Sequence, residues 1–96
     1  MSDIATNLTE RALRGIRALT AVKPDWRTKI KEESFDMQLS ERCVLGQVFG
    51  HFDKGMQALN LQHGEDGITH GFQLRPAELA SSIPEWNRIW RSLIRE

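Results

Sequence analysis

The sequence has one cysteine, three prolines, no net charge and no long apolar run. A single cysteine cannot form a disulfide within the chain, which is typical of a reducing compartment. The 13 basic and 13 acidic side chains cancel, so the strongly basic balance of many nucleic-acid-binding proteins is absent. No apolar run approaches the roughly 20 residues of a transmembrane helix. Residues 1–11 have no apolar signal core, so we expect a soluble, cytoplasmic protein.

The chain of 96 residues fits a single domain over residues 1–96. A chain of this length buries about 60–65% of its unfolded surface, so we expect a modest core. The sequence shows no internal repeat and no low-complexity segment. It also has no P-loop, no dinucleotide-binding glycine motif and no calcium-binding loop, so we expect no cofactor.

Apolar side chains that recur with a helical period predict four helices, at residues 3–22, 24–32, 41–59 and 83–95. Pro24 suits the first turn of the second helix, and Ser40 is the expected N-cap of the third. Ser82 and Glu85 have the spacing of a capping box at the start of the last helix. The buried stripe expected for the first helix consists of Ile4, Leu8, Ala12, Gly15, Leu19 and Val22. The arc expected for the last consists of Ile83, Trp86, Ile89, Trp90, Leu93 and Ile94.

Two segments alternate apolar and polar side chains, which is the pattern of a half-buried strand. The first is residues 34–39, and the second is residues 68–74, with a loop expected at residues 60–67 and one helical turn after Pro76. Two strands alone are only marginally stable, so they should pack on the helices. The predicted fold class is therefore α+β, a mostly helical domain with a two-stranded β-sheet.

The predicted helix at residues 41–59 contains three glycines, although each costs about 1 kcal/mol relative to alanine. Gly55 falls on the apolar face, whereas a second face is made of Cys43, Gly46, Gly50 and Gln57. Three explanations are open: close packing within the chain, a groove for a partner, or a kink near Gly50 or Gly55. We favour close packing, in which case Gly50→Leu should destabilise the protein by roughly 1–3 kcal/mol through overpacking.

Cys43 is the only cysteine in the sequence, and it has three possible roles. With His51, His63 and His70 it could bind zinc, but the spacing lacks the close ligand pairs of zinc sites. It could be a nucleophile with His70 as base, but no catalytic signature surrounds it. A buried, inert thiol is the favoured interpretation. No paired-carboxylate site is recognisable either, so we expect neither an enzyme nor a metal site.

Arginines recur on the polar faces of the first and last predicted helices. These arginines are Arg11, Arg14 and Arg17, and then Arg88, Arg91 and Arg95. Such faces are commonly solvated, but they can also contact phosphates or an acidic protein surface. Because the arginines lie opposite the apolar arcs, we expect alanine in their place to leave the fold intact.

The pattern W…I…DM…CVLGQ.FG…G…L…HGF…W, across residues 26–86, resembles a group of small uncharacterised proteins encoded by actinobacteria and their bacteriophages. The matching residues are Trp26, Ile30, Asp36, Met37, Cys43, Val44, Leu45, Gly46, Gln47, Phe49, Gly50, Gly55, Leu59, His70, Gly71, Phe72 and Trp86. The resemblance implies no activity, but it implies a small intracellular accessory protein that acts on host machinery. We therefore expect a non-catalytic protein that binds an unidentified protein partner, in the bacterial or host cytoplasm. Nucleic-acid binding by the arginine faces is the alternative.

Overall fold

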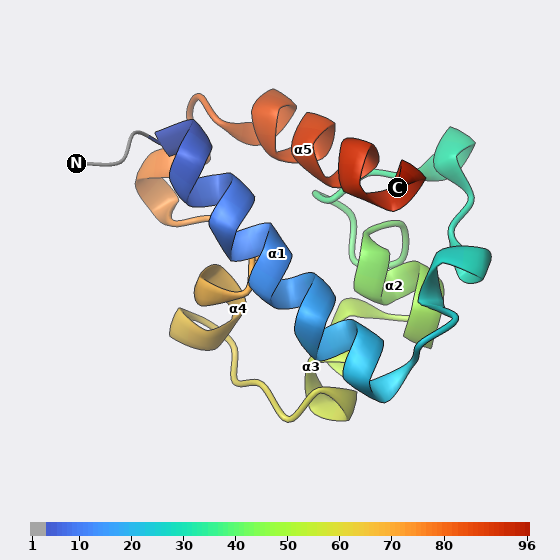
Figure 1. Cartoon of the computed structure of the whole chain (residues 1–96). Helices are drawn as coiled ribbons and strands as arrows, with labels where there is room; N and C mark the ends of the chain where they lie inside the picture. The colour runs from blue at the N-terminus through green and yellow to red at the C-terminus, as the bar shows by residue number, and fades with distance from the viewer. Residues whose placement is uncertain (1–3) are drawn as a thin grey trace.

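The computed structural model describes the backbone of residues 4–96 and the side chains from Leu8 onward, and its regular elements are all helical. The α-helices are α1 (Ile4–Val22), α2 (Val44–Phe49), α3 (Phe52–Ala58), α4 (Glu65–Thr69) and α5 (Ile83–Arg95). Short 3-10 helices span Trp26–Lys29, Glu32–Ser34 and Pro76–Glu78. The two longest helices, α1 and α5, contact each other, and α1 also contacts α4. Figure 1 shows α1 crossing the molecule diagonally, with α5 along one edge.

The predicted two-stranded sheet is wrong. Residues 4–96 contain no strand, and helices make up 63% of the chain. In residues 34–39 the side chains of Phe35 and Met37 are buried as expected, but the backbone turns. The Leu39 N–H donates to the Asp36 carbonyl at 3.1 Å, and the Met37 N–H donates to the side-chain oxygen of Asn87 at 2.7 Å. A side chain of α5 therefore satisfies the amide that a neighbouring strand would have bonded. The α+β class is replaced by an all-helical one.

Residues 68–74, the second predicted strand, contain the end of α4 and a tight turn. The Phe72 N–H donates to the Gly67 carbonyl at 2.9 Å, and the Gly71 N–H donates to the Ile68 carbonyl at 3.1 Å. Phe72 and Leu74 are buried, so the alternation reports burial correctly. The alternation of buried and exposed side chains arises from a helix end followed by a turn, and not from extended backbone. α4 also begins at Glu65, inside the segment predicted as a loop.

The predicted helix at 41–59 is two short helices, because Gly50 ends α2 with a φ of +99°. His51 then caps α3, since its Nδ1 accepts a hydrogen bond from the Asp53 N–H at 3.1 Å. The predicted cap Ser40 is wrong, because Cys43 is the N-cap of α2. A β-carbon on Gly50 would meet no atom within 4 Å and the residue is exposed, so the close packing on which the expected overpacking by Gly50→Leu rested is absent. The cost of that substitution comes from the left-handed backbone.

The close packing expected within the chain does occur, but at Gly46 rather than along a whole face. A β-carbon on Gly46 would lie 2.2 Å from the Ser40 carbonyl oxygen and 2.8 Å from the Glu41 Cα. The loop before α2 therefore folds back onto the helix at a point where only glycine fits. The kink at Gly50 and the close approach at Gly46 together explain two of the three glycines, and the buried Gly55 packs against Leu45.

The predictions for α1 and α5 are confirmed in position and largely in burial. Leu8, Ala12 and Leu19 of α1 are buried, whereas Val22 is 47% exposed, and Ile4 lies outside the described side chains. Five members of the predicted α5 arc are buried: Trp86, Ile89, Trp90, Leu93 and Ile94. Ser82 does precede α5, but its hydroxyl makes no capping hydrogen bond, so the predicted capping box is not formed. The predicted helix at 24–32 is two 3-10 helices.

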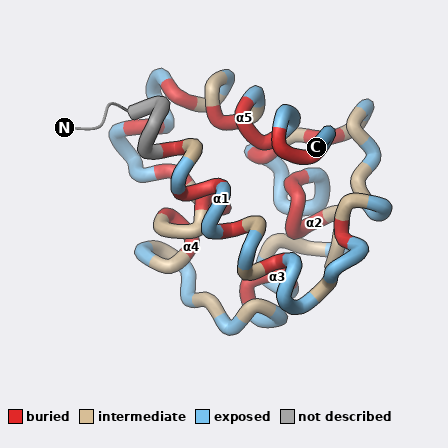
Figure 2. The backbone as a smooth tube through the Cα atoms, viewed as in Figure 1, coloured by how far each residue is buried: buried red, intermediate tan, exposed pale blue. Residues whose placement is uncertain are grey.

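The carbonyl oxygen of Gly71 joins α5 to the turn that follows α4. It accepts hydrogen bonds from the indole N–H groups of Trp86 at 2.8 Å and Trp90 at 2.9 Å. Phe72 stacks on Trp90 with a centroid separation of 5.5 Å. Buried residues of α1, α2, α3 and α5 belong to one core cluster with Phe72 and both tryptophans, and Figure 2 marks the buried segments in red. One backbone oxygen thus fixes the orientation of two large side chains.

Candidate functional site

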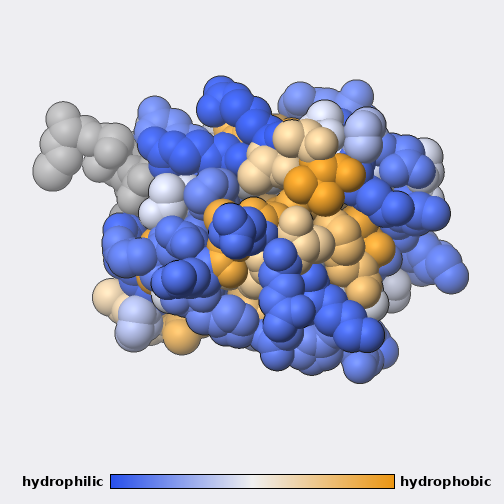
Figure 3. All heavy atoms as spheres, turned by 90° about the horizontal axis from the view of Figure 1, so that it is seen from below, coloured by the Kyte–Doolittle hydropathy of each residue, from blue (hydrophilic) through white to orange (hydrophobic). Residues whose placement is uncertain are grey.

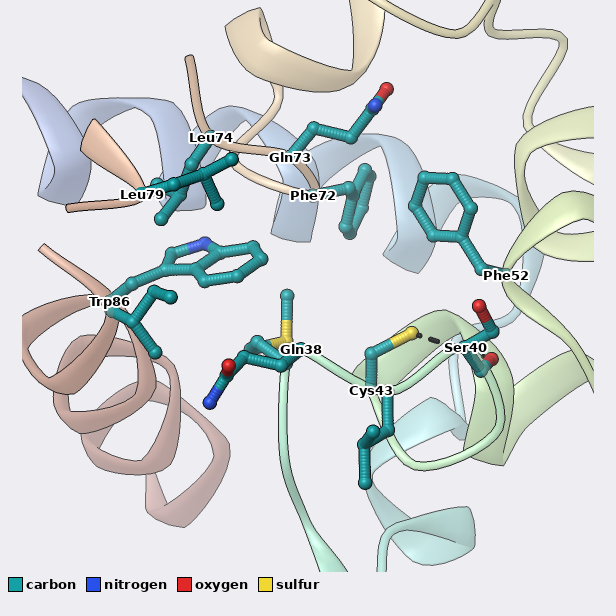
Figure 4. Close-up of a pocket in the computed structure, with 12 residues that line it drawn as sticks. Gln38, Ser40, Cys43, Phe52, Phe72, Gln73, Leu74, Leu79 and Trp86 are labelled. Carbon is teal, nitrogen blue, oxygen red and sulfur yellow. Dashed lines mark hydrogen bonds between the residues drawn. The ribbon is translucent and has the colours of Figure 1, made fainter. Parts of the chain in front are cut away.

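An open pocket of about 360 Å³ lies between α5, α3 and the turns that replace the predicted strands. Its walls are apolar side chains with a few polar groups, and Figure 4 shows Trp86, Phe72 and Phe52 around the opening. Leu39 and Leu79 belong to the wall and are 43% and 53% exposed. The lining residues are Met37, Gln38, Leu39, Ser40, Cys43, Phe52, Phe72, Gln73, Leu74, Leu79, Ile83 and Trp86.

The aromatic walls of the pocket are held in place by contacts outside it. The Trp86 indole is fixed by its bond to the Gly71 carbonyl, and Phe72 is fixed by stacking on Trp90. Phe52 packs edge-on against the His63 ring at a centroid separation of 5.3 Å. A binding site whose walls are already ordered loses less conformational entropy when it is filled. The pocket is therefore preformed.

Three polar groups of the pocket wall are bonded within the protein itself. The Gln73 side-chain oxygen accepts the Gly64 N–H at 2.9 Å, and its backbone oxygen accepts Arg11 at 3.2 Å. The Ser40 carbonyl accepts the Phe52 N–H at 2.8 Å. Because these groups already have partners, an apolar group fits the pocket better than a highly polar one.

Cys43 is buried, as predicted, and its thiol is used in local structure. Its Sγ accepts the Gly46 N–H at 3.3 Å and lies 3.8 Å from the Ser40 carbonyl oxygen (Figure 4). Burial raises the pKa of the Cys43 thiol above its ordinary value, and this effect outweighs the backbone N–H groups that favour thiolate. A protonated, buried thiol is a poor nucleophile and a poor metal ligand.

The histidines do not gather around Cys43. His51 and His63 flank the carboxylate of Asp53, at 3.7 Å and 3.0 Å, and all three are exposed by 40% or more. The Nδ1 of His70 lies 2.8 Å from the Asp66 carbonyl oxygen, one turn away on α4. Within residues 4–96 there is no group of three or more histidine, cysteine or carboxylate side chains arranged to hold a metal ion.

We expect Cys43 to react slowly with a thiol reagent in the folded protein. The reason is that the side chain is 2% exposed and its raised pKa keeps it protonated. Absorbance with Ellman's reagent at pH 8 would measure the rate, and the same protein in guanidinium chloride provides the fully reactive control. Complete labelling within seconds under native conditions would contradict a buried, inert thiol.

Arg11 lies inside the protein and not on an arginine surface. It is 2% exposed, and its guanidinium donates to both carboxylate oxygens of Glu78, at 2.8 and 3.1 Å. It also donates to the Ile68 carbonyl at 2.8 Å, so one side chain ties α1 to α4 and to the turn beyond it. The expectation that Arg11 lies on the polar surface of its helix is therefore wrong, and we expect alanine in its place to destabilise the fold. Of the first three arginines, Arg14 and Arg17 remain on the surface.

The three arginines of α5 line a second, more polar depression, which we call the arginine hollow. Its volume is about 530 Å³, and its lining residues are Pro84, Asn87, Arg88, Arg91, Ser92 and Arg95. Arg88 pairs with Glu85, and the Arg95 Nε lies 2.8 Å from a Glu32 carboxylate oxygen. Arg91 donates to the Phe35 carbonyl at 2.9 Å, and its guanidinium lies over the Phe35 ring. These arginines are exposed, as the sequence predicts.

The predicted face of small residues does not exist as one surface. Cys43 and Gly46 are buried at the start of α2, whereas Gly50 and Gln57 are exposed. The break at Gly50 rotates α3 relative to α2, so residues that share a face in a continuous helix are separated.

The pocket residue Leu79 gave no signal in the sequence, because a single leucine in a turn has no periodicity.

Apolar side chains also reach the surface away from the pocket. Leu13 and Val22 of α1 are 36% and 47% exposed, and neither lines the pocket. Figure 3 shows one face on which apolar residues form an area bordered by hydrophilic ones. Exposed leucines and valines are normal on protein surfaces when they occur singly. The pocket is distinguished by combining exposed leucines with an ordered aromatic wall.

Comparison of the chain with protein-family models, with curated proteins and with solved structures finds no match. Among the described residues, no helix is long and apolar enough to cross a membrane. The functional conclusion therefore rests on the geometry of the pocket and of the arginine hollow.

Proposed function

We propose that the protein is a non-catalytic binding protein whose pocket receives an apolar side chain of a protein partner. The observation that supports this most directly is an open pocket of about 360 Å³ with ordered aromatic walls and two exposed leucines. Apolar pockets of roughly this size are typical binding sites. At protein interfaces, a few anchor side chains in such pockets supply much of the binding energy.

The chemistry of the site supports binding rather than catalysis. Cys43 is the nucleophilic thiol in the wall, and burial keeps it protonated. The other polar side chains of the wall, from Gln38, Ser40 and Gln73, are neutral and do not exchange protons near neutral pH. The proposed context, an accessory protein in an actinobacterium or its phage, is supported by the resemblance of residues 26–86 alone.

We expect Leu79→Asp to abolish capture of the partner while leaving the fold intact. Binding is lost because a carboxylate at the pocket wall would have to be desolvated when an apolar group binds. The fold is retained because Leu79 is 53% exposed and contributes little to the core. The measurement is quantitative mass spectrometry of proteins captured from an actinobacterial lysate, with and without nuclease. Thermal melts followed by circular dichroism would establish that the variant folds.

Val22→Asp is the matched control for this experiment, since it places the same charge on an apolar residue of α1 that is 47% exposed, close to the 53% of Leu79. Proteins captured by the wild type and by Val22→Asp, but lost with Leu79→Asp, identify the partner. If every captured protein is retained equally by all three chains, the pocket is not the binding site.

Binding of nucleic acid in the arginine hollow is the alternative function, and exposed arginines on one helix face support it. We nevertheless expect only weak binding to random duplex DNA at physiological salt, with a dissociation constant near or above about 10⁻⁴ M. The reason is that only three arginines line the hollow, which limits the number of phosphate contacts. Fluorescence anisotropy of a labelled duplex, titrated at several salt concentrations, measures this affinity. A sub-micromolar, salt-dependent complex that Arg88→Ala/Arg91→Ala/Arg95→Ala abolishes would establish the alternative instead.

A further inference from the structure

We propose that the partner segment is acidic: an apolar anchor fills the pocket, and carboxylates a few residues away bind in the arginine hollow. This inference rests on the proposed function, because it assigns the chemistry of the segment that the pocket receives. Two observations lead to it. The pocket and the hollow adjoin on α5, and the charge of the hollow is carried by guanidinium groups.

The pocket and the hollow meet at the contact between Met37 and Asn87. Met37 lines the pocket, Asn87 lines the hollow, and the Asn87 side-chain oxygen accepts the Met37 N–H at 2.7 Å. In the first turns of α5, Ile83 and Trp86 face the pocket, while Pro84 lies on the side of the hollow. The linings of the pocket and the hollow are thus joined through this hydrogen bond, and the proposed segment runs from one to the other along this side of α5.

The arginines retain the capacity to bind further carboxylates. Arg91 donates to a backbone carbonyl rather than to a carboxylate, so its charge is not neutralised by a direct ion pair. The side chains of Arg88 and Arg95 are 69% and 68% exposed, and exposed ion pairs such as theirs contribute little to stability. A partner carboxylate can compete for these groups, and guanidinium groups bind carboxylates through two parallel hydrogen bonds.

The local acidic residues indicate where the partner carboxylates belong. Asp36 lies at the junction, where it accepts the Gln38 N–H at 3.0 Å and contacts the Asn87 amide at 3.4 Å. A second carboxylate there would be repelled. The acidic residues of the partner should therefore follow the anchor at some distance, beside Arg91 and the last turn of α5.

A peptide explains this surface better than a nucleic acid does. At 1.5 Å per residue, the helix from Arg88 to Arg95 is only about 10 Å long, which matches a few phosphates at most. The adjoining apolar pocket also has the size for an anchor side chain, and it gives a phosphate backbone no cationic partner.

A random dodecapeptide display library, selected on the biotinylated full chain, tests the inference. Twelve extended residues span about 40 Å, which is long enough to cover both depressions. We expect selected peptides to combine one aromatic or large aliphatic residue with two or more acidic residues on one side of it. Selected peptides that share an apolar anchor but carry no excess of acidic residues would overturn the inference.

Charge reversal distinguishes failure of this inference from failure of the proposed function. We expect Arg91→Glu and Arg88→Glu each to weaken a selected peptide at least tenfold by anisotropy at low salt, and Arg17→Glu on α1 to leave its affinity unchanged. Two variants are used because Arg91 also contacts Phe35.

Peptides that lose binding with Leu79→Asp but tolerate both reversals would overturn the acidic segment alone. Peptides that tolerate Leu79→Asp, or a library that yields none dependent on it, would overturn the pocket as well. Displacement of a selected peptide by duplex DNA at low micromolar concentration would favour a nucleic-acid partner and overturn the inference.

Discussion

Arg11→Met is expected to lower the free energy of unfolding by about 3–5 kcal/mol, as is typical when one partner of a buried ion pair is removed. Methionine keeps the length of the aliphatic stem but has no donor. Glu78 would then be left as a buried carboxylate without its cation, and the Ile68 and Gln73 carbonyls would each lose a hydrogen bond. Urea unfolding followed by tryptophan fluorescence at pH 7 measures the change.

The double variant Arg11→Met/Glu78→Met is the matched control. Because it removes both charges, it should be less destabilised than Arg11→Met alone, although the Ile68 and Gln73 carbonyls still each lose one hydrogen bond. A loss of less than 1 kcal/mol for Arg11→Met would mean that the pair contributes little to holding α1 in place.

The same pair predicts a dependence of stability on pH. The hydrogen bond from Arg11 holds the pKa of Glu78 below its ordinary value near 4.5, although burial opposes it. A carboxyl with a lowered pKa in the folded state contributes stability that is fully present above its unfolded pKa. That contribution is lost as the pH falls below about 4.5 and through the lower folded value. Glu78→Gln should therefore reduce the slope of stability against pH in this acidic range.

Gly46→Ala is expected to destabilise the protein by about 3 kcal/mol, although alanine is the better helix former. Helix propensity alone would favour the substitution by about 1 kcal/mol. The new β-carbon, however, would lie 2.2 Å from the Ser40 carbonyl oxygen and within 3 Å of two backbone atoms of Glu41. Backbone atoms cannot rotate away as a flexible side chain can, so the clash outweighs the propensity. The measurement is the midpoint of urea unfolding, compared with the wild type.

Gly50→Ala separates the effect of crowding from that of backbone conformation. Its β-carbon would meet no atom within 4 Å, but the φ of +99° is strained for alanine, so we expect a loss of about 1–2 kcal/mol. If Gly46→Ala were neutral or stabilising, the loop at Ser40 would have to move away at little cost. The explanation of Gly46 by close approach would then fail.

The sequence predicts α1 and α5 well because each has a long apolar arc with a single period. The bounds of α5 agree at both ends, and five of its arc residues are buried. The break at Gly50 was one of three open explanations and was not the favoured one, because the apolar positions of α2 and α3 happen to continue one helical period. A positive φ at a glycine leaves no trace in periodicity, although a glycine in a helical pattern is a warning.

The two predicted strands show what alternation does and does not report. Phe35, Met37 and Phe72 point into the core, as the pattern requires. Alternation gives the direction of side chains, but it does not show which group bonds the backbone. Here a side chain of α5 and the carbonyls of local turns provide that bonding, and these partners are invisible to a scan of short windows.

The pocket could not be predicted because its walls come from four separate stretches of the chain. The burial of Arg11 was missed for a similar reason. Its position on α1 is compatible with the polar side of the helix, and the residue that makes burial possible, Glu78, lies 67 positions away. Only a partner for the charge distinguishes a buried arginine from a solvated one, and that partner is set by the tertiary fold.

The distance along the chain between hydrogen-bonded residues differs between the Gly71 and Arg11 contacts, and this difference has a consequence for the order of folding. The indole bonds to the Gly71 carbonyl join residues 15 and 19 positions apart, whereas Arg11 joins residues 57 and 67 positions apart. Closing a longer loop has a higher entropic cost, so contacts between nearby segments form more readily. The turn at Gly71 and α5 can therefore come together first, and α1 docks onto them afterwards. In the native state, undocking of α1 would be a partial opening, and hydrogen exchange would report it as a unit distinct from α5.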